Sequence, residues 1–186
     1  AAELVRTRAP NTRQRTLDAA VTPVVLSDYT ASGRASSVYG RITARLGRLR
    51  LAPGAPFDYW QPTDVTTKSP WVTGELDSAA GLSLPGGGGI YRQFPALTVL
   101  NGLNGNPTLQ PERAIHADLT IVQALPNAIA VQITGFQRHE RDVLWAAGSE
   151  PRALPEGGFV LGRGDAQWSN RLTGRARGIE ALLRRD

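Results

Sequence analysis

The chain has 186 residues and a net charge of +5, which fits one domain or one domain with an arm. Hydrophobic residues make up 41% and charged residues 20%, a globular rather than a disordered composition. The absence of cysteine excludes disulfides, thiol catalysis and cysteine-ligated zinc. No apolar run approaches the roughly 18 residues of a membrane span.

The first 20 residues are polar and basic, and we expect them to form an extended arm rather than a core element. Since the sequence starts without methionine, we also expect processing of the N-terminus. The arm would be either solvated or docked on a neighbouring subunit or on nucleic acid, although arginines without interleaved aromatic residues indicate nucleic acid only weakly. Its basic residues are Arg6, Arg8, Arg13 and Arg15.

Residues Val38 to Leu51 alternate between apolar and basic side chains. A strand with a β-bulge at Gly47 would place all the aliphatic residues on one face. An amphipathic helix is the competing interpretation, although its glycines disfavour it. On the strand interpretation the opposite face carries a row of arginines that is either solvated, part of a subunit interface, or an anion-binding surface, and its members are Arg41, Arg45, Arg48 and Arg50.

Two further segments are predicted to be loops. Ala52 to Pro62 carries Phe57, Tyr59 and Trp60 between prolines, and would either fold over one end of the core or form a contact surface. Gly81 to Gly89 would be a flexible loop tip, since no phosphate-binding motif surrounds its glycines.

The clearest pattern lies between Ile115 and Phe136, which predicts two strands joined at Pro126-Asn127. In the second strand the aliphatic side chains of residues 129, 131 and 133 alternate with smaller or polar ones, which predicts one buried face. The tail, Arg175 to Asp186, carries apolar residues at helical spacing and predicts a short amphipathic helix.

These elements amount to eight or so short strands separated by turn signals, a pattern typical of an antiparallel β-sandwich, jelly roll or barrel. We therefore predict an all-β chain: an antiparallel β-sandwich or jelly-roll-like single domain over residues 21–186, with an extended N-terminal arm over residues 1–20 and a short C-terminal helix.

No catalytic constellation emerges from the sequence. His116 and Asp118 share a strand face, but two ligands do not make a metal site, and a structural hydrogen bond is the simpler interpretation. Arg163 to Asp165 spells RGD, a tripeptide that some viral and matrix proteins use to bind cell-surface integrins. A chain rich in arginine and glycine also produces it by chance, which is the simpler interpretation. We expect no enzymatic activity, no cofactor and no metal.

The basic N-terminal run RTRAPNTRQR and the β pattern across residues 21–170 together resemble small virion proteins of bacterial viruses, namely jelly-roll capsid, decoration and head-to-tail proteins. The resemblance implies a structural protein of a virion that binds copies of itself and other assembly proteins through its arm and loops. The arginines and aromatic residues named above would be its interface residues.

Two alternatives remain open. A secreted or periplasmic β-sandwich binding module, of pilus or carbohydrate-binding type, would use Phe57, Tyr59 and Trp60 as its ligand platform. A β-fold hydrolase would need a concave pocket with at least two carboxylates or a titrating histidine.

Overall fold

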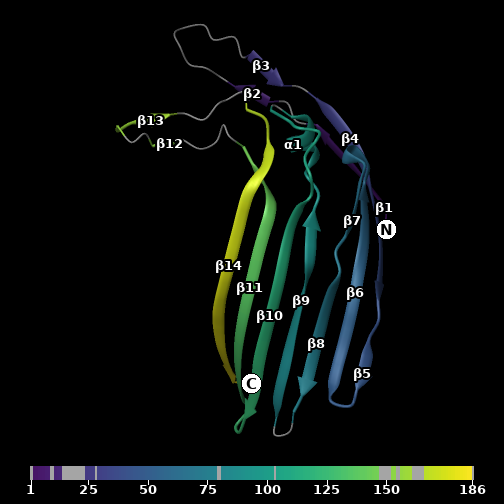
Figure 1. Cartoon of the computed structure of the whole chain (residues 1–186), viewed down its shortest axis with the longest axis vertical. Coiled ribbons are helices and arrows are strands. Elements are labelled where there is room, and N and C mark those ends of the chain that lie inside the picture. Colours follow the sequence, from purple (N-terminus) through teal and green to yellow (C-terminus); the bar gives the residue numbers. More distant parts are fainter. Residues whose placement is uncertain are drawn as a thin grey trace.

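The computed structural model describes most of the chain, and the fold that it shows is almost entirely β (Figure 1). The described residues are 2–8, 11–13, 24–27, 29–78, 81–102, 104–146, 152–153, 156–160 and 166–185. The strands are β1 (Ala2–Arg8), β2 (Asn11–Arg13), β3 (Val24–Ser27), β4 (Thr30–Arg41), β5 (Ala44–Leu46), β6 (Leu49–Trp60), β7 (Val65–Lys68), β8 (Trp71–Asp77), β9 (Leu82–Gln93), β10 (Glu112–Leu125), β11 (Ile129–Trp145), β12 (Arg152–Ala153), β13 (Phe159–Val160) and β14 (Ser169–Arg185). The helices are the 3-10 turn η1 (Gln61–Thr63) and α1 (Leu97–Asn101).

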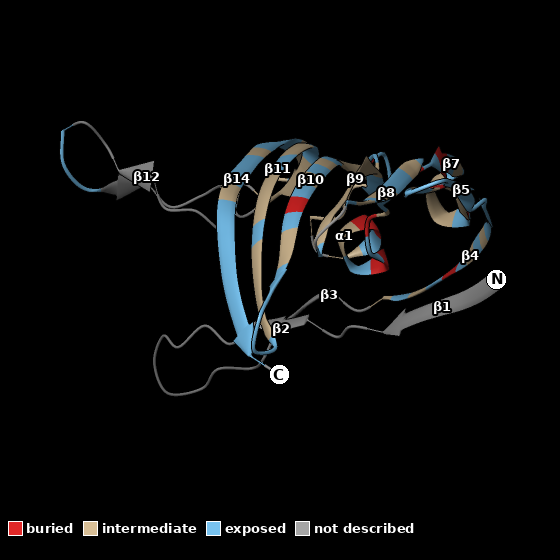
Figure 2. Cartoon of the chain, turned by 90° about the horizontal axis from the view of Figure 1, so that it is seen from below, coloured by how far each residue is buried: buried red, intermediate tan, exposed pale blue. Residues whose placement is uncertain are grey.

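One sheet of ten strands dominates the described residues, and its order is β1-β4-β6-β8-β9-β10-β11-β14, with β5 and β7 both paired to β6. Among the described residues, every strand pairing within it is antiparallel. The predicted all-β, antiparallel fold is confirmed. The predicted two-layer sandwich or jelly roll is not observed, because the main strands follow one another in a single curved sheet (Figure 2).

The two ends of the sheet are built differently. At the lower end in Figure 1 the described connections between strands are short turns at residues 47–48 and 126–128. At the upper end the connections are longer: residues 94–111, which contain α1, join β9 to β10, and residues 146–168 join β11 to β14. Gly47 has φ +61° and lies in the turn between β5 and β6, where Leu46 pairs with Leu49. The predicted β-bulge at Gly47 is therefore a hairpin turn, for which glycine suits the left-handed conformation.

The β10–β11 hairpin confirms the strongest prediction from the sequence. The two strands pair from Arg113↔Arg141 down to Leu125↔Ile129, and Asn127 in the turn has φ 62°. The predicted C-terminal helix is wrong, since the segment up to Arg185 belongs to β14 and pairs along β11. Pairing along β11 gives the side chains of this segment neighbours on a partner strand, whereas an isolated three-turn helix is only marginally stable in water.

The predicted loop around the four glycines is also wrong, because Gly86 to Gly89 lie inside β9 between β8 and β10. A Cβ added at Gly89 would lie 2.6 Å from Trp71 Cβ, and one added at Gly86 would lie 2.8 Å from the Asp118 carbonyl oxygen. The glycines therefore allow neighbouring strands and side chains to approach closely, which is a recognised use of glycine in strands.

The core is small and lies at the upper end, inside the curve of the sheet. Figure 2 shows α1 there, with buried residues on the helix. Leu97, Leu100 and Leu109 are almost completely buried, and Trp60 stacks on Phe94 with ring centroids 6.1 Å apart. The rest of the sheet has no second apolar layer within the described residues.

Of the predicted arm, residues 2–8 form β1, which pairs with β4, and residues 11–13 form β2, which pairs with β3. The remaining arm residues, including Arg15, lie outside the described residues, as does the RGD tripeptide. The division into an arm and a domain stays a prediction. In the part of the chain that the structure describes, no helix is long and apolar enough to cross a membrane.

Candidate functional site

The two faces of the sheet have opposite chemistry, and this contrast defines the candidate functional surfaces. We call the side that α1 covers the inner face and the other side the outer face. A Cβ added at Gly33 of β4 would lie 3.5 Å from Leu97 of α1, which places Gly33 on the inner face. Strand alternation and the register of the strand pairs then assign the other positions to one face or the other.

The outer face is apolar and exposed. Ile179 and Leu183 on β14 are 81% and 72% exposed, and Val38 on β4 is 67% exposed. Ile133, predicted to be buried, is 43% exposed on this face. The large outer-face hydrophobic residues that are exposed are Val38, Leu46, Phe57, Val72, Leu76, Ile115, Leu119, Ile121, Leu125, Ile133, Ile179 and Leu183. A monomer in water rarely exposes a continuous apolar surface of this kind.

Charged residues border this apolar band without entering it. On β14 the band runs from Ile179 to Leu183, with Arg177 above it and Arg185 below it. On β10 it runs from Ile115 to Leu125, with Arg113 above. At the described outer-face positions of β6, β8, β9, β10, β11 and β14 between these borders, there is no aspartate, glutamate, lysine or arginine.

The inner face is polar by comparison. On β10 and β11 it carries His116 and Asp118, with 3.3 Å between His116 Nε2 and Asp118 Oδ1, and Arg138, which forms an ion pair with Glu140 at 2.5 Å. Thr120 and Thr134 share a hydrogen bond across the same two strands, with 2.9 Å between their hydroxyl oxygens. The part of the chain that the structure describes holds no group of three or more metal-ligating side chains.

The predicted row of arginines lies mostly on the inner face, near the lower end. Arg45 pairs with Arg50 across the β5–β6 hairpin, and the Arg50 guanidinium donates to Glu75 at 3.0 Å. The guanidinium of Arg41 lies 5.7 Å from the centre of the Trp71 ring. Arg48 lies in the hairpin turn. The prediction that these arginines lie opposite the neighbouring aliphatic residues holds for Arg41, Arg45 and Arg50. Arg6 and Arg8 lie on β1 and Arg13 on β2.

The three predicted aromatic interface residues do not form one surface, because they lie on a strand rather than a loop. Phe57 is on the outer face, where Lys68 lies 5.8 Å from its ring centre, and Tyr59 shares that face. Trp60 lies on the inner face and is only 5% exposed. The prolines that suggested a loop are accommodated inside β6, where Pro53 and Pro56 offer carbonyl oxygens to Ile42 and Ser69.

The arginines along the upper border of the outer face were missed in the sequence. Arg92, Arg113 and Arg141 lie directly opposite one another across β9, β10 and β11. Arg175 and Arg177 continue this border on β14, opposite His139 and Gln137. Their common signal is a basic residue one alternation step beyond an aliphatic run, visible as Arg92 after Ile90, Arg113 before Ile115 and Arg177 before Ile179.

Comparison with known proteins finds the same fold in solved structures of much longer chains. A mutant of the ferric enterobactin receptor PfeA from Pseudomonas aeruginosa superposes with a TM-score of 0.67 at 18% identity, covering 86% of this chain and 25% of the receptor. The siderophore receptor PirA from Pseudomonas aeruginosa gives 0.67 at 17% identity, covering 84% and 32%. The copper transporter OprC gives 0.67 at 17% identity, covering 98% and 31%. No protein-family model and no curated protein matches the chain.

These likenesses establish the fold, and this chain spans about a quarter to a third of the neighbours' length. They overturn the predicted resemblance to virion proteins, and with it the capsid function and the virion location, because the structural neighbours are receptors and a transporter. The secreted or periplasmic binding module is not supported either, since the chain builds one large curved sheet and its three aromatic residues form no platform.

Proposed function

We propose that this chain forms part of the wall of a β-barrel that spans a membrane, in a protein of receptor or transport type. The observation that carries the proposal is that the sheet exposes an apolar outer face and has a polar inner face, the reverse of a sheet in a protein dissolved in water. Membrane barrels have this arrangement because lipid surrounds them and their interior is polar.

The dimensions of the outer band support the proposal. From Ile115 to Leu125 the strand β10 advances ten residues, about 34 Å at ~3.4 Å per residue. A tilt of roughly 35–45° reduces this to a height of about 24–28 Å, against an apolar band of about 25 Å in outer-membrane barrels. The short turns at one end of the sheet and the long connections at the other also match such barrels.

The receptor or transport role rests on the structural neighbours, which are a ferric enterobactin receptor, a siderophore receptor and a copper transporter. In this role the inner face would line the interior, and its paired polar side chains, among them His116 with Asp118 and Arg50 with Glu75, would face water or other parts of the protein. The role involves no catalytic step, and the expectation that the chain is not an enzyme is kept as part of the proposal.

The absence of cysteine allows a direct test. Single cysteines replace Val131, on the outer face of β11, or Gln132, its neighbour on the inner face, and each carries a small fluorophore after folding into phosphatidylcholine vesicles. We expect brominated lipids to quench the fluorophore at 131 and an aqueous quencher to reach the one at 132. Equal access of the aqueous quencher to both positions would overturn the proposal.

A further inference from the structure

A shallow groove crosses the outer face in the upper half of the apolar band. Its floor is Gly135 on β11, and its walls are Leu119 on β10 and Ile179 on β14, which are the direct register partners of Gly135. A Cβ built on Gly135 meets nothing within 4 Å, so the space above the floor is open. The groove is predominantly apolar and has a volume of about 770 Å³.

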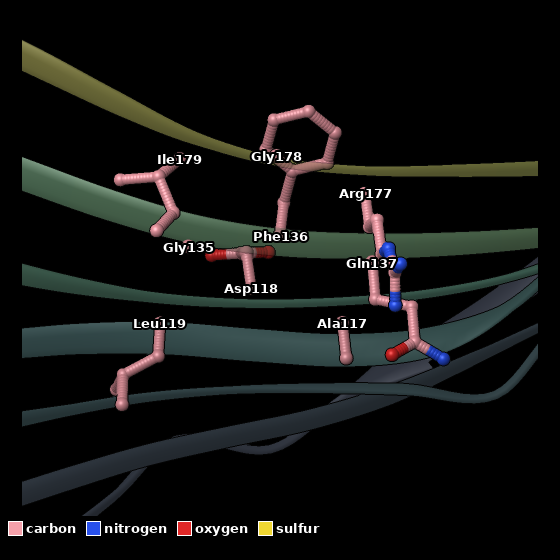
Figure 3. A pocket seen from close by; sticks show the side chains of 9 residues that line it. All are labelled: Ala117, Asp118, Leu119, Gly135, Phe136, Gln137, Arg177, Gly178 and Ile179. Atoms are coloured by element: carbon pink, nitrogen blue, oxygen red, sulfur yellow. The ribbon is translucent and has the colours of Figure 1, made fainter.

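Figure 3 shows the residues around this groove. Phe136 follows Gly135 on β11, so strand alternation turns its ring to the inner face. There the ring lies against Gly178, where an added Cβ would be 2.8 Å from it. The next row towards the long connections is Ala117, Gln137 and Arg177, again direct register partners. The groove therefore ends at an amide and a guanidinium, one row above its floor.

The charge around this end of the groove is positive on the outer face. Asp118 also lines the groove, but strand alternation turns its side chain to the inner face, where it lies 3.3 Å from His116. Arg175 lies on the same face of β14 as Arg177, about 7 Å further along at ~3.4 Å per residue. Both side chains are exposed, and among the described residues neither forms an ion pair. Beyond them lies the row formed by Arg92, Arg113 and Arg141, in which like charges directly opposite one another are unfavourable without an anion.

We propose that this groove holds an acyl chain of a membrane lipid whose phosphorylated, anionic headgroup is bound by Arg175 and Arg177. The inference deepens the proposed function and rests on it. Arginine suits this role because its planar guanidinium binds phosphate oxygens through two parallel hydrogen bonds. The surface offers a site for each part of such a ligand: the apolar groove for the acyl chain and the two guanidinium groups beyond its end for the headgroup.

The test uses the chain folded into vesicles, with a fluorophore on Ile121→Cys, which lies one alternation step from Leu119 on the same face. Two vesicle mixtures of phosphatidylglycerol and phosphatidylcholine are compared. In the first only the phosphatidylglycerol carries brominated acyl chains, and in the second only the phosphatidylcholine does. The ratio of the quenching in the first mixture to that in the second measures the preference for the anionic lipid at this site. We expect each of Arg175→Gln and Arg177→Gln to reduce that preference about fivefold, since a basic residue at an anionic surface contributes ~1 kcal/mol.

Two matched controls separate this site from general effects. Arg185→Gln removes an arginine from the same face of β14 at the opposite border, and we expect it to leave the preference unchanged. Gly135→Phe fills the groove and should reduce quenching by both lipids, whereas Gly40→Phe fills another open outer-face position, on β4, and should not. Circular dichroism confirms that each variant is folded.

The outcomes are distinct. If the preference is insensitive to Arg175→Gln and Arg177→Gln, or falls equally with Arg185→Gln, the headgroup site is refuted. If the arginine changes matter but Gly135→Phe does not, the arginines bind an anion without a seated lipid, and the proposal is wrong. If no lipid quenches the fluorophore at 121 while the fluorophore at 131 is quenched, another protein surface covers the groove and the proposal is again wrong. Failure of the quenching test at 131 and 132 would instead refute the membrane-spanning wall itself.

Discussion

The two faces of the sheet can be compared with one substitution made twice. Ile133 lies at the middle of the outer band on β11, and Leu182 lies on the inner face of β14, opposite the residue before Ile133. The two side chains are 43% and 56% exposed, so they are similar in size, height and exposure and differ in the face that they occupy. Ile133→Arg and Leu182→Arg therefore change the same property in two environments.

The expected costs are different if lipid covers the outer face. An arginine at the bilayer midplane on the lipid side of a barrel costs about 2–4 kcal/mol. This corresponds to a loss of roughly 30- to 700-fold in the folding equilibrium, at ~1.4 kcal/mol per factor of ten. Leu182→Arg should stay within about 0.5 kcal/mol of the parent, as is usual for surface substitutions in water.

The assay is equilibrium unfolding in denaturant of the protein folded into phosphatidylcholine vesicles, followed by tryptophan fluorescence. The difference between the two variants is the quantity of interest, because general effects of adding an arginine to a strand cancel in it. Two equal costs, or a larger cost for Leu182→Arg, would refute the assignment of the outer face to lipid.

Three further substitutions test the packing, each by the free energy of unfolding in the same assay. Trp60→Ala should cost about 3–5 kcal/mol, because it removes a buried ring from the small core; a cost below that of a typical surface change would show that the core at the upper end is not formed. Gly89→Val should cost about 1–3 kcal/mol through its clash inside β9, whereas Gly40→Val, in open space, should cost less; the reverse order would contradict the close packing of β9. Arg50→Gln removes an exposed ion pair and should cost less than about 1 kcal/mol; a larger loss would indicate that this pair is desolvated.

The sequence was informative about which residues share a face. The alternation around Ile129, Val131 and Ile133 identified a strand and its partners, and the alternation around Arg41 and Arg45 separated basic from aliphatic side chains. An alternation with a period of two separates the side chains into two faces, however, and does not determine which face meets water. The aliphatic face was therefore placed in a core because that is its usual position in a protein dissolved in water, and the structure shows it exposed.

Other errors arose where local patterns compete with strand pairing. Ile179, Leu182 and Leu183 fit a helical spacing, but Ile179 and Leu183 also fit one face of a strand, with Leu182 on the other. The deciding factor is the partner strand β11, a long-range contact that no local window contains. The four glycines of β9 likewise indicate a loop by composition, while their neighbours on β8 and β10 determine that they lie in the sheet.

The position of the arginines distinguishes between possible covers for the outer face. Within the described residues the apolar band has no second layer, so something else must cover it. Consider a second copy packed face to face on this surface about a two-fold axis. With the strands of the two copies pointing the same way, the arginines of the upper border would meet those of the other copy. With the strands pointing opposite ways, they would meet Arg185, so arginine would face arginine in both cases. Lipid would avoid this conflict, because in the proposed membrane wall acyl chains would cover the band while phosphates of the headgroups would lie at the level of the arginines. The same residues that make the face unsuitable for another copy of the chain therefore make it suitable for a bilayer.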